Sequence, residues 1–204
     1  SHTGYTATSN TSTSNVWVEW VAARLGVAIT PAEVGFVTTR VPCPAQARGL
    51  ASTCSGYAQG GARVTNPQGI GKTGGALTIP IVEQIASHNT RTVPGFTTGF
   101  GAGDIVFVLG GNNDVFVQFG AVAQGLPPAD AVAAVQTAAT ELATLVKTEI
   151  IAKGATRVVV MTLPDFTVTP AFSGLPADNK AFLNQLSEAF NAALLTGLNG
   201  SSAR

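Results

Sequence analysis

The stretch Asp104-Ile-Val-Phe-Val-Leu-Gly-Gly-Asn-Asn-Asp114 decides the fold that we predict for this chain. Four consecutive apolar residues followed by Leu109 are typical of a strand buried on both faces. The run ends at a Gly-Gly-Asn-Asn-Asp turn that is too polar to remain in a core. Open α/β sheets place their chemistry in polar loops at the carboxyl ends of strands, so Asn113 and Asp114 are candidate site residues. An ordinary turn is the alternative, because Gly, Asn and Asp are common turn residues.

The composition indicates a folded domain with few charges. The 204 residues are 45% hydrophobic and 11% charged, and the formal net charge is zero. A disordered chain is excluded by the apolar content, and a nucleic-acid-binding protein by the lack of a basic excess. The length suits a single domain over residues 1–204. No apolar run reaches the roughly 20 residues that span a bilayer. No signal-peptide pattern is present, so we expect a targeting segment to be absent or already removed.

The two cysteines, Cys43 and Cys54, lie in one Pro/Gly/Ser-rich region, residues 27–55. Such a region is expected to be a long irregular excursion. The cysteine separation allows a small disulfide ring, with two free thiols as the alternative, and it lacks metal-ligand spacing. Loop cysteines, few lysines and a Ser/Thr/Asn-rich start favour an exported protein, whether secreted, periplasmic or at the cell surface.

Helical spacing of apolar residues predicts four helices. The first is capped by Asn15 and ends at Gly26, the second begins at Pro80 and runs to about residue 89, and two longer helices end at Gly154 and Leu198. The residues expected to face the core are, helix by helix, Trp17, Trp20, Val21 and Leu25; Ile81, Val82, Ile85 and Ala86; Val132, Val135, Ala139, Leu142, Val146 and Ile150; and Phe182, Leu186, Phe190 and Leu194.

A second apolar run, Thr156-Arg-Val-Val-Val-Met-Thr-Leu163, predicts another strand buried on both faces. Pro164-Asp165 breaks it. The strand–helix–strand order from residue 104 to residue 163 indicates two parallel strands joined by a right-handed crossover. The chain is therefore expected to be α/β.

Three loops between these elements carry motifs that resemble those of one family. They are Ala58-Gln-Gly-Gly-Ala62, Gly111-Asn-Asn-Asp114 and Leu163-Pro-Asp-Phe-Thr-Val-Thr-Pro170. Their order and spacing resemble three motifs of the SGNH/GDSL serine esterases and lipases. These are the second sequence block, the third sequence block and the segment that follows the fourth strand. The segments Trp17-Val-Glu-Trp-Val-Ala-Ala-Arg-Leu-Gly26 and Leu186-Ser-Glu-Ala-Phe-Asn-Ala-Ala-Leu194 are similar to those of secreted and autotransporter-passenger esterases. The resemblance covers nearly the whole chain.

This resemblance implies a fold, a reaction and a site. The implied fold is a three-layer α/β/α, flavodoxin-like arrangement around a parallel sheet. The implied reaction is hydrolysis of a carboxylic ester or lipid substrate, with no metal and no cofactor. The oxyanion-hole glycine of the family falls on Gly61 and its oxyanion-hole asparagine on Asn113, whose N–H groups stabilise the charge of a tetrahedral intermediate. Asp114 is expected to hold the turn.

Two motifs of the family do not occur in these 204 residues. One is the Gly-Asp-Ser-Leu block with the serine nucleophile, of which Ser1 matches the second serine at best. The other is the Asp-x-x-His block with the general base. His2 is assigned to an irregular start and His88 to a solvated position. The first and last strands of the family's 2-1-3-4-5 order are therefore expected to be missing, and complementing segments to supply the nucleophile and the histidine.

Two other functions stay open. One is a catalytically inactive fragment that keeps a ligand groove and acts as a binding or scaffold module. The other is a flavodoxin-like nucleotide binder, which is disfavoured because no phosphate loop of the Walker or dinucleotide type follows a strand. Phe116, Phe119 and Phe172 suit an acyl pocket and the core equally well. Asp104 and Asp165 flank opposite strand ends and cannot form a carboxylate pair.

Overall fold

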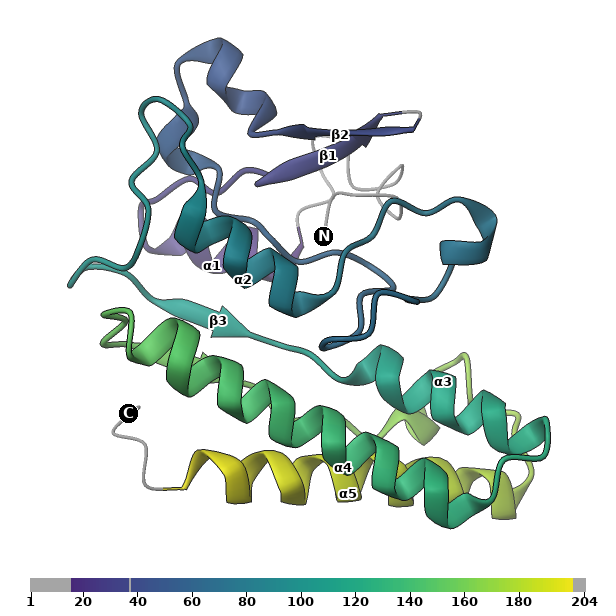
Figure 1. Ribbon diagram of the computed structural model, residues 1–204. Coiled ribbons are helices and arrows are strands. Elements are labelled where there is room, and N and C mark those ends of the chain that lie inside the picture. The colour runs from purple at the N-terminus through teal and green to yellow at the C-terminus, as the bar shows by residue number, and fades with distance from the viewer. Residues whose placement is uncertain (1–15, 37, 200–204) are drawn as a thin grey trace. The chain divides into compact units, whose positions relative to one another are not determined.

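The chain is a mixed α/β protein in the computed structural model, which describes residues 16–36 and 38–199. Its strands form two separate pairs, the parallel β3–β4 and the antiparallel β1–β2, the second of which is labelled in Figure 1. The chain divides into two compact units. Unit 1 comprises the residues up to 62 and residues 67–99, and unit 2 comprises residues 63–66 and those from 100 onward.

Unit 1 begins with the helix α1 (Trp17–Arg24), which ends in a Schellman turn. The Gly26 N–H donates to the Ala23 carbonyl at 3.1 Å, and the Val27 N–H reaches back to the Ala22 carbonyl at 3.0 Å. Gly26 has a φ of 72°, a conformation that glycine adopts without a Cβ clash. The predicted helix end at Gly26 is confirmed.

Three of the four residues in the predicted apolar stripe of α1 are exposed, and the fourth, Val21, is half-buried. Trp17, Trp20 and Leu25 are 44%, 56% and 56% exposed, and Ala22 is the buried residue of the helix. The prediction that the two tryptophans anchor the core is therefore wrong. Periodicity identifies side chains that share one face of a helix, but it does not say whether that face is covered.

Helix starts in unit 1 differ slightly from the predicted ones. α2 (Ile81–Thr90) has Pro80 as its N-cap rather than as its first helical residue. Val16 occupies the N-cap of α1, whereas the predicted cap, Asn15, lies outside the described residues. The buried residue of α2 is Gln84, which corrects the predicted inner face. On that face Ile81, Val82 and Ile85 are half-buried and Ala86 is exposed.

Residues 27–55 hold more regular structure than predicted. β1 (Glu33–Phe36) and β2 (Thr39–Pro42) form an antiparallel hairpin, and two short 3-10 turns follow it. All four residues of β2 are exposed, so no apolar alternation marks the strand in the sequence. Cys43 and Cys54 form the disulfide that the sequence allowed, with an S–S distance of 2.01 Å, and both residues are buried.

Unit 2 is built on the parallel pair β3 (Val106–Val108) and β4 (Val158–Val160). The predicted parallel pairing is confirmed, with Val106 opposite Val158 in the register. Burial on both faces is not found. Val108 and Val158 are buried, whereas Ile105, Leu109 and Val159 are 38%, 41% and 42% exposed. Each strand is also shorter than its apolar run.

Three α-helices complete the described part of unit 2. They are α3 (Asn112–Ala123), α4 (Pro128–Leu145) and α5 (Ala177–Leu198), and a π-helical turn, Val146–Ile151, extends α4. α4 and α5 pack side by side, and α3 contacts both (Figure 1). The predicted core residues that are buried are Val135, Ala139, Leu142, Val146, Ile150, Leu186, Phe190 and Leu194, while Val132 and Phe182 are half-buried. The stripes of the two long helices were therefore largely predictable. Among the described residues, no helix has the length and apolar character needed to cross a membrane.

The polar run after β3 is helix rather than loop. Asn112, Asn113 and Asp114 form the first turn of α3, and Asp114 is only 2% exposed. The interpretation of this run as a turn too polar for a core is therefore wrong. Gly111 forms the junction with a φ of 101°, and a Cβ placed on it would lie 2.1 Å from Cζ of Phe190. Only glycine fits this position.

From the close contact at Gly111 we predict that adding one methyl group at this position destabilises the fold. We expect Gly111→Ala to lower the free energy of unfolding by at least about 2 kcal/mol, because it adds both a steric clash and backbone strain. Gly120, inside α3, has no atom within 4 Å of the position that an added methyl group would take, so Gly120→Ala is the control. It should raise the stability by about 0.5–1 kcal/mol. Urea unfolding of both variants measures the difference, and equal effects would contradict the packing described.

Candidate functional site

Gly61, the predicted oxyanion-hole glycine, lies in a tight turn of unit 1. The Ala62 N–H donates to the Gln59 carbonyl at 3.3 Å, and Gly61, at the third position of this turn, has a φ of 82°. A type II turn requires such a positive φ there. The Ile70 N–H donates to the Gly61 carbonyl at 2.9 Å, and a Cβ on Gly61 would lie 2.4 Å from the Ile70 oxygen. Packing alone therefore demands glycine at this position.

The Gly61 N–H is a candidate donor. Gly61 is buried, and within the part of the chain that the structure describes its N–H has no hydrogen-bond acceptor. Buried backbone N–H groups are nearly always paired, so an orphan is a feature that calls for an explanation.

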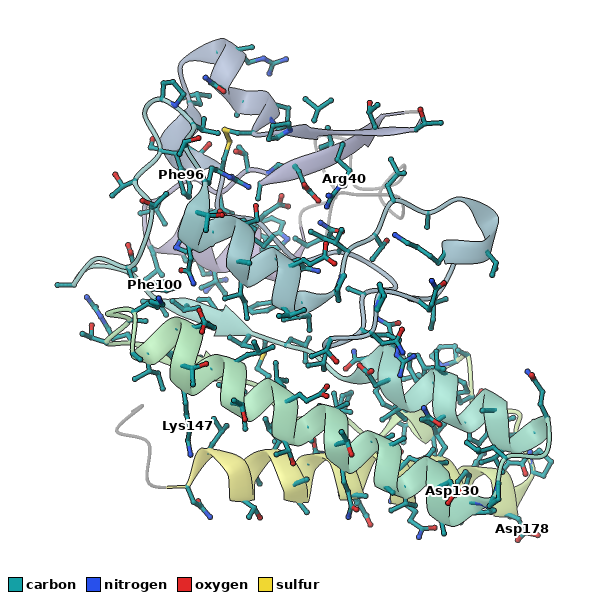
Figure 2. The ribbon with its side chains drawn as sticks, in the orientation of Figure 1. Arg40, Phe96, Phe100, Asp130, Lys147 and Asp178 are labelled. Atoms are coloured by element: carbon teal, nitrogen blue, oxygen red, sulfur yellow. A yellow bond between two sulfur atoms is a disulfide. The ribbon has the colours of Figure 1, made fainter. Side chains whose placement is uncertain are left out.

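A buried polar network fixes the turn that contains Gly61. The Gln59 amide donates to Glu33 at 2.6 Å and accepts from the Ile79 N–H at 2.9 Å. The Thr78 hydroxyl donates to the Gly60 carbonyl at 3.0 Å. Arg40, labelled on the β1–β2 hairpin in Figure 2, donates to Glu33 at 3.2 Å. The turn is therefore held through both its side chains and its backbone.

Asn113, the predicted oxyanion-hole asparagine, lies in the first turn of α3 in unit 2. The first hydrogen bond of the helix runs from the Val115 N–H to the Gly111 carbonyl at 3.0 Å. The N–H groups of residues 112–114 thus precede the helical ladder. Asn113 is half-buried. Its neighbour Asn112 has a buried Oδ1 without a hydrogen-bond partner among the described residues.

Asp114 anchors this helix start, as predicted for a structural residue. Its Oδ2 accepts from the Val64 N–H at 3.0 Å, and its Oδ1 accepts from Nε of Arg63 at 2.9 Å. Burial raises the pKa of Asp114, while the hydrogen bond and charge of Arg63 and the Val64 N–H oppose that shift. Both carboxylate oxygens are therefore committed to structure and are not available to a substrate.

The third predicted loop, residues 163–170, follows β4. The Asn191 amide of α5 binds Leu163 twice: its Oδ1 accepts from the Leu163 N–H at 2.8 Å and its Nδ2 donates to the Leu163 carbonyl at 2.9 Å. Asp165 then caps a 3-10 turn, η5 (Phe166–Val168), by accepting from the N–H and the hydroxyl of Thr167. These two hydrogen bonds lower the pKa of Asp165. The segment is thus tied both to α5 and to itself.

Aromatic side chains join this segment to α3. The ring centroid of Phe116 lies 4.7 Å from that of Phe166 and 5.2 Å from that of Phe172. Phe119 extends the cluster to Phe172 and Phe182 at 6.5 and 6.3 Å. Since β3 and β4 are parallel, the segments after them lie at the same end of the sheet, and the Phe cluster holds them together. Unit 2 therefore brings two of the three predicted motif loops side by side.

His88 is half-buried and hydrogen-bonded at both ring nitrogens rather than fully solvated, which corrects the prediction. Its Nε2 lies 3.0 Å from the Gly99 carbonyl and its Nδ1 lies 3.2 Å from the Tyr57 hydroxyl. A carbonyl only accepts, so in the neutral ring Nε2 donates and Nδ1 accepts from Tyr57. Buried Arg91 lies over the Tyr57 and Phe96 rings and donates to the Cys54 carbonyl at 2.9 Å. This cluster ties α2 to the disulfide region of unit 1. Phe96 is labelled in Figure 2.

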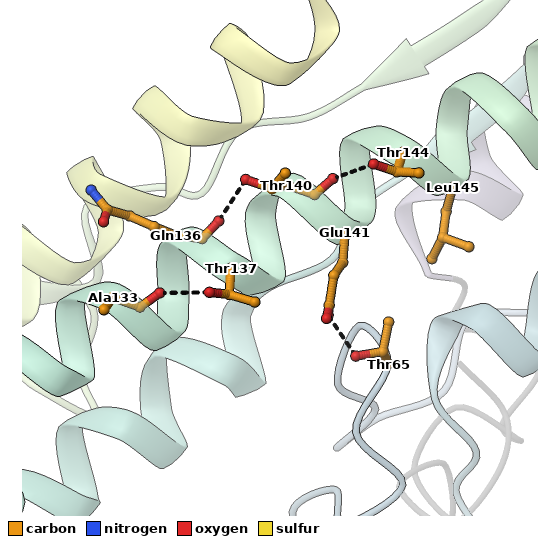
Figure 3. Close-up of a pocket in the computed structure, with 8 residues that line it drawn as sticks. All are labelled: Thr65, Ala133, Gln136, Thr137, Thr140, Glu141, Thr144 and Leu145. Carbon is orange, nitrogen blue, oxygen red and sulfur yellow. Dashed lines mark hydrogen bonds between the residues drawn. The ribbon is translucent and has the colours of Figure 1, made fainter.

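A separate groove of about 610 Å³ lies along α4 (Figure 3). Its only charged lining residue, Glu141, accepts from the Thr65 hydroxyl at 2.6 Å. Thr137, Thr140 and Thr144 each donate to a carbonyl of their own helix. The groove includes neither Gly61 nor Asn113, and its lining offers no nucleophile paired with a base. The described residues also contain no group of three or more His, Cys, Asp or Glu side chains that could hold a metal ion.

Several anchoring residues escaped the sequence analysis. Asn191 was the easiest of them to predict from the sequence. Asparagine is unfavourable inside a helix, so its presence in a long helix with an apolar stripe indicates a side-chain hydrogen bond. Arg63 and Gln59 gave no comparable signal, since both lie in irregular segments. Their partners, Asp114 and Glu33, are 51 and 26 residues away in sequence.

Comparison of the chain with family models, with curated proteins and with solved structures yields no match. Support for a function of this chain therefore comes from its sequence motifs and from the geometry of its loops.

From the Arg63–Asp114 ion pair we predict that removing the Asp114 charge destabilises the fold. Asp114→Asn should lower the free energy of unfolding by about 3 kcal/mol, because it leaves the Arg63 charge, 12% exposed, without a partner. Asp130→Asn, at an exposed site in the first turn of α4, is the matched control and should change little. Denaturant unfolding at neutral pH compares the two. A loss no larger than that of the control would show that the ion pair does not hold α3.

From the partial burial of Tyr57 we predict that the free energy of unfolding falls at alkaline pH. Burial raises the pKa of Tyr57 to about 12, with the Arg91 charge lowering it and Glu33 raising it. Because the folded pKa exceeds the unfolded value of about 10, the contribution is complete below pH 10 and disappears as the pH rises toward 12. Because Tyr57 is only half-buried, solvent screening reduces the effect, and we expect about 2 kcal/mol to be lost in that interval. Tyr57→Phe should remove this dependence.

Tyrosinate absorbance checks the assignment directly. The chain has two tyrosines, so in a Tyr5→Phe background the absorbance reports Tyr57 alone. A midpoint near 10 in the folded protein would contradict the burial of this hydroxyl.

Proposed function

We propose that this chain is the oxyanion-stabilising part of an SGNH-type serine ester hydrolase that acts on carboxylic esters, including lipids. The backbone N–H of Gly61 and the side-chain amide of Asn113 are the assigned donors. The proposal starts from the order of the three motif loops in the sequence. The observation that carries it is the junction at Gly111, where a three-residue connection leads from β3 into α3 and Asn113 falls in the first helical turn.

The chemistry of ester hydrolysis suits these two donors. The carbonyl oxygen of an ester gains negative charge as the tetrahedral intermediate forms, and rigid N–H donors stabilise that charge without reorganising. Gly61 is a buried residue, and its N–H has no acceptor in the described chain, which supports the first assignment. The anchoring of the helix start by Asp114 supports the second, because it fixes the backbone that carries Asn113.

The proposed fold is a three-layer, flavodoxin-like α/β/α arrangement with additional strands in the parallel sheet. Parallel sheets are normally covered on both faces and contain more than two strands. Among the described residues β3 and β4 pair only with each other, which leaves one edge of each strand open to a further strand. The exposed Ile105, Leu109 and Val159 side chains near these strands support further covering of the sheet faces.

The proposal assigns the nucleophile and the base to complementing segments. These 204 residues contain neither the Gly-Asp-Ser-Leu block nor the Asp-x-x-His block. In this proposal the two segments bring the serine and the histidine together with the missing strands. Export to a secreted, periplasmic or cell-surface location is part of the same proposal, and the buried Cys43–Cys54 disulfide supports it, since such bonds persist in oxidising compartments.

Hydrolysis of p-nitrophenyl acetate and butyrate tests the site assignment in a preparation that contains the complementing segments. Asn113→Ala should lower kcat by about 10²–10³-fold, because one oxyanion donor is lost. Asn112→Ala is the matched control, one residue away in the same helical turn, and should leave kcat nearly unchanged. Equal activities of the two variants would contradict the role of Asn113. An absence of both turnover and fluorophosphonate labelling would favour an inert binding or scaffold module.

Intact-mass measurement tests the complementing segments. We expect the active species to contain further polypeptide besides the 20.7 kDa of this chain. A single 20.7 kDa species that unfolds cooperatively as a monomer would contradict that part of the proposal.

A further inference from the structure

An exposed apolar surface lies on α1 and the turn that follows it. We call it the α1 patch and define it as Trp17, Trp20, Leu25 and Val27, which are 44%, 56%, 56% and 58% exposed. The tryptophans are three residues apart, so they project from the same side of the helix. They are also the only tryptophans of the chain. Single exposed apolar residues are ordinary, but a cluster that contains two indoles indicates a docking surface.

The α1 patch is held in place by ordered backbone. In a Schellman turn the residue after the glycine usually packs back against the helix. Here the hydrogen bond from the Val27 N–H to the Ala22 carbonyl is made, yet the Val27 side chain stays 58% exposed. The turn therefore displays Leu25 and Val27 beside the tryptophans instead of folding them inward.

The exposed charge next to the patch, Arg24, favours an anionic partner. Arg24, in the last turn of α1, is exposed. The acid of this helix, Glu19, accepts a hydrogen bond from the Val16 N–H at 2.8 Å, which directs its carboxylate to the backbone. Within the described part of unit 1 the exposed charged residues are Arg24, Arg40, Arg48 and Glu83. Arg40 is paired with Glu33, so Arg24 and Arg48 against Glu83 leave a small excess of cations among the exposed charges of the described part of unit 1.

We propose that the α1 patch docks on a lipid–water interface that carries anionic headgroups. Indole rings suit such an interface, because one part of the ring is apolar and its N–H remains hydrated. Arg24 adds attraction to anionic headgroups. A second copy of the chain fits less well, since four side chains at these exposures offer roughly 400 Å², half of the ~800 Å² per partner of a stable interface. None of the four patch residues or Arg24 belongs to the assigned oxyanion hole, so the two proposals fail independently.

Tryptophan fluorescence tests this proposal in the full chain, because every indole of the protein lies in the patch. Vesicles of phosphatidylcholine with phosphatidylglycerol should shift the emission to the blue and saturate. Lipids brominated on their acyl chains should quench it. Pure phosphatidylcholine vesicles should bind the protein about fivefold more weakly, which corresponds to one arginine near the surface.

Two variants keep both indoles as probes. Leu25→Ser with Val27→Ser should weaken vesicle binding about tenfold, and Val168→Ser, a 77% exposed valine of unit 2, is the matched control and should leave it unchanged. Arg24→Gln should remove the preference for anionic lipid. Circular dichroism of each variant verifies that the fold is retained.

Three results would overturn the proposal. One is unchanged emission together with no protein in the vesicle pellet. Another is binding that the Leu25/Val27 variant and the Val168 variant weaken equally. The third is a blue shift that depends on protein concentration without vesicles and coincides with a dimer in analytical ultracentrifugation, which would assign the patch to self-association.

Discussion

The close approach of Gly111 to the ring of Phe190 is the constraint on which unit 2 depends. β3 ends at Val108 and α3 starts at Asn112, so three residues must change the backbone from an extended to a helical conformation. Gly111 makes this change possible with a φ of 101°. The ring of Phe190 fills the space where a side chain would stand. α5 therefore sets where α3 begins, and with it the positions of Asn113 and Asp114.

Unit 1 uses glycine in a comparable way at Gly61. There the neighbouring backbone, rather than a ring, occupies the space: Gly69 and Ile70 pack against the turn so closely that either a Cβ on Gly61 or one on Gly69 would lie 2.4 Å from a carbonyl oxygen. Both motif glycines thus have a packing reason that is independent of catalysis. The catalytic argument has to come from the donors themselves, which are the Gly61 N–H and the Asn113 amide.

The helices with wide apolar stripes could be predicted from the sequence, and so could the parallel pairing of the strands. α4 and α5 bury residues such as Leu142 and Phe190 where the 3.6-residue period places them. α3 was missed because Gly-Asn-Asn-Asp is typical of a turn, although the same residue types are favoured at helix starts. The exposure of Trp17 and Trp20 was not predictable, since it depends on what packs against α1 and not on α1 itself.

Long-range polar contacts account for most of what the sequence did not reveal about the site. Asp114 could be assigned a structural role from its position after Asn113, but its partners Arg63 and Val64 lie 51 and 50 residues earlier. The double hydrogen bond of Asn191 to Leu163 likewise joins segments 28 residues apart. Such contacts leave no periodic signal, because each depends on one pair of residues that the fold brings together.

A crystal structure of the fluorophosphonate adduct of the complemented protein would test the central claim most directly. The account predicts that the phosphoryl oxygen of the adduct accepts a hydrogen bond from Nδ2 of Asn113, at the roughly 2.7–3.1 Å expected for an oxyanion donor. An adduct whose phosphoryl oxygen is bound by other groups, with Asn113 turned away from it, would contradict the account.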